Sequence, residues 1–207
     1  MSTKQRILDE ALTLFAEKGY ANVFVGQIAE AVGIKAPSLY KHFKSKQDIF
    51  NAILDEMKKR YEEQASGLNM DGNDPGADAM MFSGITEDEL VKTGVGLFLH
   101  FLHDEYTCKF RRMLTLEQYR DPELSRLFTK QYVDDPLAYQ SAMFAMLSAV
   151  GALKSADAGV MALQFYAPIN MLLMLCDRQP EREPEALSLL EQHIRQFSRL
   201  YGKEERK

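Results

Sequence analysis

The sequence predicts an all-α protein. Apolar residues recur at the three- and four-residue spacing of amphipathic helices along most of the 207 residues, and we find no run with the alternation of a half-buried strand. Glycines and prolines divide the pattern into segments of helical length. With 46% apolar residues, the chain can build a small N-terminal domain and a larger core.

The first two helices are defined by their ends. The first is expected to begin at Ser2, where the sequence has the S-x-x-Q spacing of a capping box, and to end at Gly19. A short second helix is expected from Val25 to Val32, because Gly33 then interrupts the apolar pattern.

A third short helix is expected around Pro37, a residue that the first helical turn accepts. One of its faces is apolar, and Phe43 is the last residue of that face. The opposite face carries Ser38, Lys41 and His42. A fourth helix opens at Ser45 with a second capping-box pattern.

Two short helices joined by a glycine turn, the second with a basic outer face, are typical of a helix-turn-helix that reads the major groove of DNA. Neither is stable alone, so the first and fourth helices are expected to brace them. A generic helical bundle has much the same apolar pattern, so the periodicity leaves both interpretations open.

Charge is distributed unevenly along the chain. Residues 1–60 carry ten Lys and Arg against seven Asp and Glu, whereas the remainder carries fifteen against twenty-three. Residues 35–46 hold four lysines and no acid. A basic head on an acidic body suits a nucleic-acid-binding protein. On charge alone, a chance cluster of solvated lysines is an equal alternative.

The run QIAEAVGIKAPSLYKHFKSK, residues 27–46, closely resembles the DNA-binding domain of TetR-family repressors. The resemblance covers residues 3 to about 55. It implies a helix-turn-helix DNA-binding domain at 1–48 and a helical effector-binding and dimerisation domain at 49–207. Phe24 and Lys35 depart from the family pattern, because Ser or Thr is common at both positions; Phe24 removes an expected phosphate contact. The most specific matches are Ile28-Ala29, Gly33-Ile34, Leu39-Tyr40, His42-Phe43 and Ser45-Lys46.

The resemblance also implies which residues contact DNA. Tyr40 and Lys46 are expected to bind phosphates, since a tyrosine can bury its ring while its hydroxyl reaches outward. The alternatives are a core tyrosine and an idle surface lysine. The start of the third helix is expected to meet base edges. The complete predicted set is Gln27, Lys35, Ala36, Pro37, Ser38, Tyr40, Lys41, His42 and Lys46.

The rest of the chain is expected to be helical after a solvated connection between Gly67 and Gly84. Pairs such as Asp121-Pro122 and Asp135-Pro136 mark the breaks. The helices are expected at about 86–103, 105–119, 122–133, 136–152, 156–177 and 184–201.

The segment from Ala158 to Cys176 has nineteen residues without a charge, which is long enough for a membrane span. Because polar residues and a proline interrupt it, we interpret it as a buried helix. Pairing the last two helices with their copies gives a four-helix dimer interface, as the resemblance also implies. A monomer that buries this helix internally is the alternative.

The middle helices are rich in aromatic residues and methionine, for which core packing is the plain interpretation. The resemblance implies instead that some of them line a pocket for a small molecule, with Glu117 as a candidate to orient it. The candidates are Phe98, Phe101, Leu102, Phe110, Met113, Leu114, Glu117, Phe144 and Tyr166.

The sequence and the resemblance together predict a cytoplasmic, homodimeric transcription regulator, a repressor that an unknown effector releases from a palindromic operator. No enzyme motif is present, and neither a cofactor, a metal nor a membrane is expected as a partner. DNA binding without a ligand, as in an architectural protein, is the alternative, and activation in place of repression also stays open.

Overall fold

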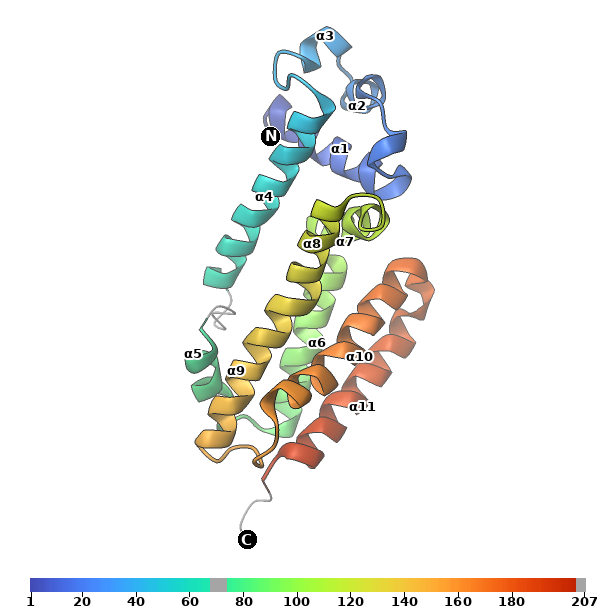
Figure 1. Cartoon of the computed structure of the whole chain (residues 1–207). Helices are drawn as coiled ribbons and strands as arrows, with labels where there is room; N and C mark the ends of the chain where they lie inside the picture. Colours follow the sequence, from blue (N-terminus) through green and yellow to red (C-terminus); the bar gives the residue numbers. More distant parts are fainter. Residues whose placement is uncertain (68–73, 204–207) are drawn as a thin grey trace. The chain divides into compact units, whose positions relative to one another are not determined.

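The computed structural model describes residues 1–67 and 74–203, and for residues 61–67 it describes the backbone only. The predicted all-α fold is confirmed (Figure 1). Among the described residues, β-structure is limited to one isolated bridge between Leu153 and Gly202. The chain forms two compact units, residues 1–64 with 104–128 and residues 65–103 with 129–207.

The first unit holds the predicted helix-turn-helix and its bracing helices. Helix α1 packs against both α2 and α7, and it does so through a buried stripe that ends at Phe15. The first unit is thus larger than the predicted 1–48 domain, because α7 shares its core. Its elements are α1 (Thr3–Lys18), the 3-10 turn η1 (Tyr20–Asn22), α2 (Val25–Val32), α3 (Ala36–Leu39), most of α4 (Lys46–Gly67), α7 (Glu105–Glu117) and most of α8 (Pro122–Thr129).

Both predicted capping residues begin their helices. The Ser2 hydroxyl accepts a 3.2 Å hydrogen bond from the Gln5 N–H at the start of α1. At α4 the Ser45 hydroxyl accepts from the Asp48 N–H at 3.0 Å, and the Asp48 carboxylate accepts from the Lys44 N–H at the same distance. These bonds satisfy N–H groups that a helix start otherwise leaves unpaired.

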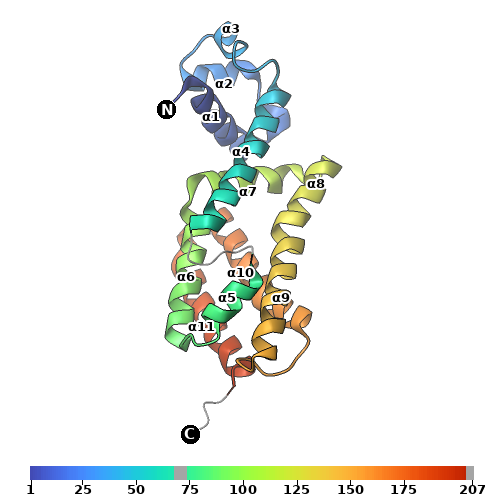
Figure 2. The same cartoon turned by 90° about the vertical axis from the view of Figure 1, so that its left-hand side faces the viewer.

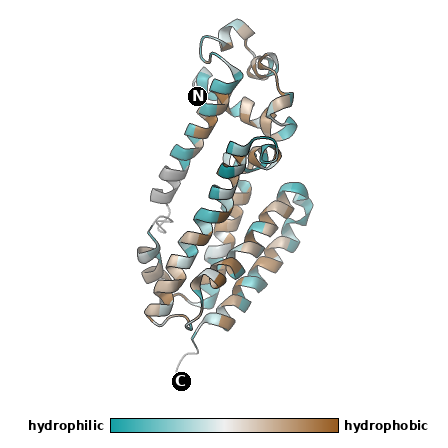
Figure 3. Cartoon of the chain, viewed as in Figure 1, coloured by the Kyte–Doolittle hydropathy of each residue, from teal (hydrophilic) through white to brown (hydrophobic). Residues whose placement is uncertain are grey.

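The second unit is a helical body. Helix α10 packs against α6, α9 and α11, and α5 packs against α9. Hydrophobic residues follow much of α10 (Figure 3). The elements are α5 (Pro75–Phe82), α6 (Glu87–His103), the π-helical turn η2 (Lys130–Asp134), α9 (Asp135–Ala149), α10 (Ala158–Arg178), the 3-10 turn η3 (Pro180–Arg182) and α11 (Glu183–Tyr201), which Figure 2 shows from a second side.

Helix α5 corrects the expectation of a connection throughout residues 67–84. Asp74 caps this helix, because its carboxylate accepts hydrogen bonds from the Gly76 N–H at 2.8 Å and the Ala77 N–H at 3.1 Å. Pro75 occupies the first helical position, where its missing N–H costs nothing. The rest of the expected connection, residues 68–73, lies outside the described residues.

The predicted break at Asp135-Pro136 is also wrong. The chain is helical from Lys130 through Ala149, with the π-helical turn η2 leading directly into α9. Pro136 lies in the first turn of α9, so the wider turn before it accommodates the ring and the missing donor. Pro136 therefore marks a change from π-helix to α-helix and does not end the helical segment.

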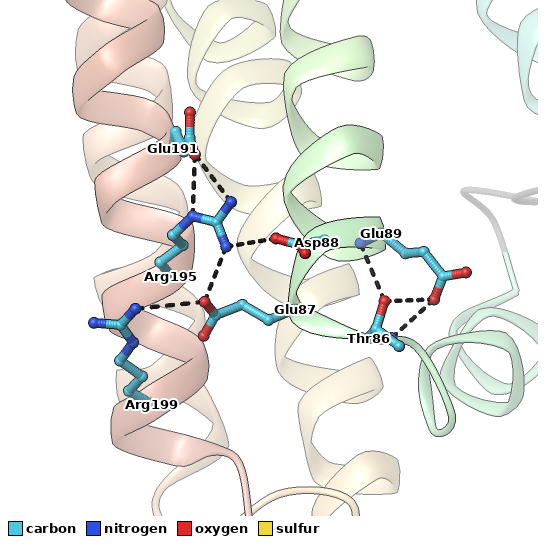
Figure 4. A network of polar contacts seen from close by, with 7 residues as sticks. All are labelled: Thr86, Glu87, Asp88, Glu89, Glu191, Arg195 and Arg199. Carbon is cyan, nitrogen blue, oxygen red and sulfur yellow. Dashed lines mark hydrogen bonds and ion pairs between the residues drawn. The ribbon is translucent and has the colours of Figure 1, made fainter.

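A charged network joins α11 to the start of α6 (Figure 4). The Arg195 guanidinium lies 3.0 Å from a Glu87 carboxylate oxygen, 2.7 Å from Asp88 and 3.0 Å from Glu191. Arg199 approaches the same Glu87 oxygen at 3.5 Å. The hydrogen bond from Arg195 is the main cause that lowers the pKa of Glu87.

Candidate nucleic-acid interface

The turn between α2 and α3 is built around Gly33. Its φ of 74° lies in the left-handed region, which glycine adopts without a Cβ penalty. The Ile34 N–H donates to the Ala29 carbonyl at 2.9 Å and closes the end of α2. Leu39 in α3 is fully buried, so the short helix is fastened by its apolar face.

The opposite face of this segment is turned outward. Lys35, Pro37, Lys41 and His42 are exposed, and Tyr40 is 52% exposed. The alternative of a core tyrosine at position 40 is therefore wrong. Of the other predicted contacts, Gln27, Ala36, Ser38 and Lys46 are partly buried.

Helix α3 is shorter than the apolar pattern suggested. It ends at Leu39, and a turn follows before the chain reaches α4. Phe43 is nevertheless buried, and its N–H donates to the Leu39 carbonyl at 3.1 Å. The apolar face expected for the helix is thus completed by the turn.

Gln27 has a structural role that the apolar pattern of the sequence does not predict. Its side-chain oxygen accepts a 2.8 Å hydrogen bond from the Phe24 N–H and so closes the start of α2. Its position at the third residue of a helix without a Ser or Thr cap is the signal that could have indicated this. The Gln27 amide NH₂ keeps its two donors for a further contact. Phe24 itself is 69% exposed.

Lys46 is directed at the protein backbone. Its ammonium donates to the Tyr20 carbonyl at 2.7 Å and the Val23 carbonyl at 2.8 Å. It also lies 4.2 Å from the centre of the Tyr20 ring. Burial lowers the pKa of Lys46, and the nearby Glu117 carboxylate opposes that shift. Since an ammonium has three N–H donors, one remains for the predicted phosphate contact.

Glu117 lies in the same unit as this interface. Its side chain is buried, with 4% of the residue exposed, and its Oε1 accepts a 2.8 Å hydrogen bond from the Tyr20 N–H. One of the two carboxylate oxygens that were expected to orient a ligand therefore already has a backbone partner.

The structure divides the other predicted ligand-binding residues between the two units. Phe110, Met113 and Leu114 are buried in the first unit. In the second unit, Phe98, Phe101 and Leu102 belong to or pack against one hydrophobic cluster, and Phe144 belongs to another. The hydroxyl of Tyr166 donates to the Tyr132 carbonyl at 3.1 Å. Their role in ligand binding stays a prediction.

Sequence comparisons match the N-terminal part of the chain. Residues 7–53 match the family described as "Bacterial regulatory proteins, tetR family". The regulator AcrR of Shigella flexneri is 45% identical over 51 residues, 25% of this chain and 24% of AcrR. The negative regulator IcaR of the biofilm operon icaADBC of Staphylococcus aureus is 51% identical over 47 residues, 23% of this chain and 25% of IcaR. The matched region thus spans about a quarter of each relative.

Solved structures share the fold over nearly the whole chain. SmeT, the repressor of the Stenotrophomonas maltophilia multidrug efflux pump SmeDEF, has a TM-score of 0.63 at 18% identity and covers 99% of this chain and 92% of its own. A TetR-family regulator from Pseudomonas syringae has a TM-score of 0.64 at 16% identity, with 98% of each chain covered. A regulator from Saccharomonospora viridis, solved with choline, has a TM-score of 0.66 at 20% identity and covers 97% of this chain and 98% of its own.

Proposed function

Because the chain carries the DNA-binding domain of the tetR family of bacterial regulatory proteins, we propose that it is a transcriptional repressor that a small-molecule effector releases from a palindromic operator. The observation that carries this proposal is the outward face of residues 35–42. There, Lys35, Lys41 and His42 are exposed on a segment fastened from behind by buried Leu39. Exposed basic side chains at the two ends of a short helix suit contact with the phosphates and base edges of a major groove.

The residues of this face have distinct roles in the proposed complex. Tyr40, Lys46 and Lys41 bind phosphates, which fixes the register of the first unit on the duplex but is independent of sequence. Lys35, Ala36 and Pro37, at the start of α3, meet base edges, and Ala36 and Pro37 offer apolar surface to thymine methyl groups. Ser38, His42 and Gln27 add contacts to the backbone and the groove.

We further propose that α10 and α11 form the interface of a homodimer. The exposed apolar residues of α10, Val160, Leu163 and Met171, fall on one face at helical spacing. Leu189 and Leu200 do the same on α11. A second copy would cover both faces at once, and its own head would then meet a second half-site about one helical turn of DNA away.

A membrane is the other environment in which such a face can be covered. Helix α10 has the length and composition of a membrane span, with a mean hydropathy of 1.6, and 28% of the window is buried. Gln164, exposed among the apolar residues of that face, favours a protein partner over lipid. We therefore propose a cytoplasmic protein.

The effector is proposed to bind in the second unit. SmeT has been solved with triclosan and the Saccharomonospora protein with choline, which supports a small-molecule role for this fold. Among the described residues, the side-chain oxygens of Gln140 in α9 and Asn170 in α10 are buried without a hydrogen-bond partner. An effector that carries N–H or O–H donors would satisfy either of these acceptors. A differential affinity of about 1 to 3 kcal/mol is enough to shift such a switch.

The relatives are named as transcriptional regulators, and we therefore propose that the chain is a regulator and not an enzyme. Within the described part of the chain, no group of three or more His, Cys, Asp or Glu side chains is placed to hold a metal.

Selection from a random pool of 30-base-pair duplexes tests the proposal. We expect the full-length protein to enrich a palindromic sequence and to retain it in an electrophoretic shift assay at two salt concentrations. Tyr40→Phe is expected to weaken binding to all sequences, whereas Lys35→Ala and Ser38→Ala alter which sequence is preferred. A pool that stays random after selection would contradict the proposal.

A further inference from the structure

The end of α7 is bonded directly to the segment that enters the helix-turn-helix. Glu117 is the last residue of α7, and its Oε1 accepts the 2.8 Å hydrogen bond from the Tyr20 N–H. The two residues are 97 positions apart in the chain, but both belong to the first compact unit. The carboxylate is buried, so this bond is shielded from water.

Tyr20 in turn is fastened to the start of α4. Its carbonyl accepts from the Lys46 ammonium at 2.7 Å, and its hydroxyl donates to the Gln47 side-chain oxygen at 2.8 Å. Its ring lies 4.9 Å from the ring of Phe50 in an edge-to-face contact. Lys46 also binds the Val23 carbonyl at 2.8 Å, one residue before the cap of α2.

The backbone conformation of Gly19 leaves room for the Glu117 carboxylate beside Tyr20. Its φ of 78° is in the region that favours glycine, and a Cβ added there would lie 3.0 Å from Glu117 Oε1. The turn thus brings the Tyr20 N–H to the carboxylate at a place where a larger residue would crowd it. The Nη1 atom of the exposed Arg120 side chain lies 3.9 Å from the same Glu117 oxygen.

We propose that Glu117 is a positioning residue of the DNA-binding head: it holds the η1 turn, and through Tyr20 and Lys46 it fixes where α2 and α4 begin. This inference rests on the proposed function, because the pose of the head matters only to a protein that reads DNA. Glu117 does not itself contact DNA or an effector in this role.

The role predicts an effect opposite to that of simple electrostatics. Removing a negative charge from a DNA-binding unit ordinarily strengthens its attraction to the phosphate backbone. If Glu117 positions the helix-turn-helix, truncation of its side chain must instead weaken binding, because the Tyr20 N–H loses its acceptor. The direction of the change therefore separates the two accounts.

Three variants make the comparison. Glu117→Ala removes both the acceptor and the charge, whereas Glu117→Gln keeps an oxygen for the Tyr20 N–H. Glu17→Ala removes an exposed carboxylate from α1 of the same unit and is the control. For a duplex that the wild-type protein selects from the random pool, we expect Glu117→Ala to bind about tenfold more weakly, which corresponds to the loss of one buried hydrogen bond. Glu117→Gln is expected to stay within about twofold of wild type, and Glu17→Ala to bind at least as tightly as wild type.

Hydrogen exchange of the DNA-free protein supplies the second readout. We expect faster exchange in Glu117→Ala in a peptide that contains Tyr20, with unchanged exchange in peptides from α10, which excludes general unfolding. Unchanged protection at Tyr20, or DNA binding by Glu117→Ala as tight as wild type, would overturn the inference. If the wild-type protein selects no duplex, the proposed function fails, while the exchange measurement still decides whether Glu117 holds the turn.

Discussion

The Arg6 guanidinium donates a 2.5 Å hydrogen bond to the backbone carbonyl of Val32. This bond ties α1 to the last residue of α2, next to the glycine turn that leads into α3. Helix α2 is therefore held at both ends, by Arg6 of α1 at its last residue and by Lys46 just before its first residue.

Arg6→Leu should lower the stability of the protein. It removes a charged donor from a carbonyl at a helix end, and we expect the free energy of unfolding to fall by about 1 kcal/mol. Urea denaturation followed by circular dichroism measures this change. Lys18→Leu, at an exposed lysine near the end of α1, is the control and should change stability less.

Replacing two glycines of the α2 region by alanine should change the stability of the protein in opposite directions. Gly33 follows the end of α2 in a left-handed conformation, whereas Gly26 lies inside the helix. Neither Gly33 nor Gly26 has a heavy atom within 4 Å of an added Cβ, so conformation alone separates them. Gly33→Ala should destabilise the protein by about 1 kcal/mol, because its φ of 74° disfavours a Cβ. Gly26→Ala, inside α2, should stabilise it by up to about 0.5 to 1 kcal/mol. Equal changes in denaturation midpoint would contradict this account of the turn.

Alanine substitutions at a second pair of glycines, both in α6, test the packing of the second unit. At Gly94 in α6 an added Cβ would lie 2.5 Å from the Cδ1 of buried Ile194, whereas at Gly96 it would meet nothing within 4 Å. We expect Gly94→Ala to cost about 1 to 3 kcal/mol, since α11 or the Ile194 side chain must move. Gly96→Ala should be stabilising through helix propensity. Thermal unfolding of the two variants gives the comparison; a higher melting temperature for Gly94→Ala would speak against the tight contact of α6 with α11.

The Arg195 network predicts an acid dependence of stability. Arg195 lowers the pKa of Glu87 from its ordinary value of 4.5, so ionised Glu87 stabilises the fold above about pH 4.5, and this contribution is lost as the pH falls through the lowered pKa. Glu87→Gln should reduce the melting temperature at pH 7 and make its decline between about pH 5 and 3 shallower. Glu17→Gln serves as the control. A parallel decline in Glu87→Gln and wild type would exclude this contribution.

Local signals in the sequence predict most of the helix-turn-helix region, residues 2–46. Gly33, Pro37 and the two serine caps act on their own neighbours, so the short helices and their starts could be predicted from adjacent residues. The exposure of Tyr40 follows less directly, since its apolar ring lies on the same face of the expected helix as buried Leu39, and Tyr40 is nevertheless 52% exposed. The resemblance to known regulators supplied that part.

Contacts between distant segments could not be predicted in the same way. Glu117 lies among apolar residues in the sequence, which favoured a ligand-facing role, but its partner is a backbone N–H that no side-chain pattern marks. Lys46 looked like a free surface cation because the carbonyls that it binds become available only when η1 folds back on α4. The helix break predicted at Asp135-Pro136 is wrong for a different reason. The π-helical turn before Pro136 accommodates a proline that would end an ordinary α-helix.

The salt dependence of binding tests most directly whether the exposed basic side chains of residues 35–42 enter a groove of DNA. For the selected duplex, we expect Lys41→Ala to reduce the slope of log K against log salt by about 1, the loss of one phosphate contact. Lys18→Ala, at an exposed lysine of α1, should keep the wild-type slope. A Lys41→Ala protein whose affinity and slope both equal those of the wild type would contradict the claim.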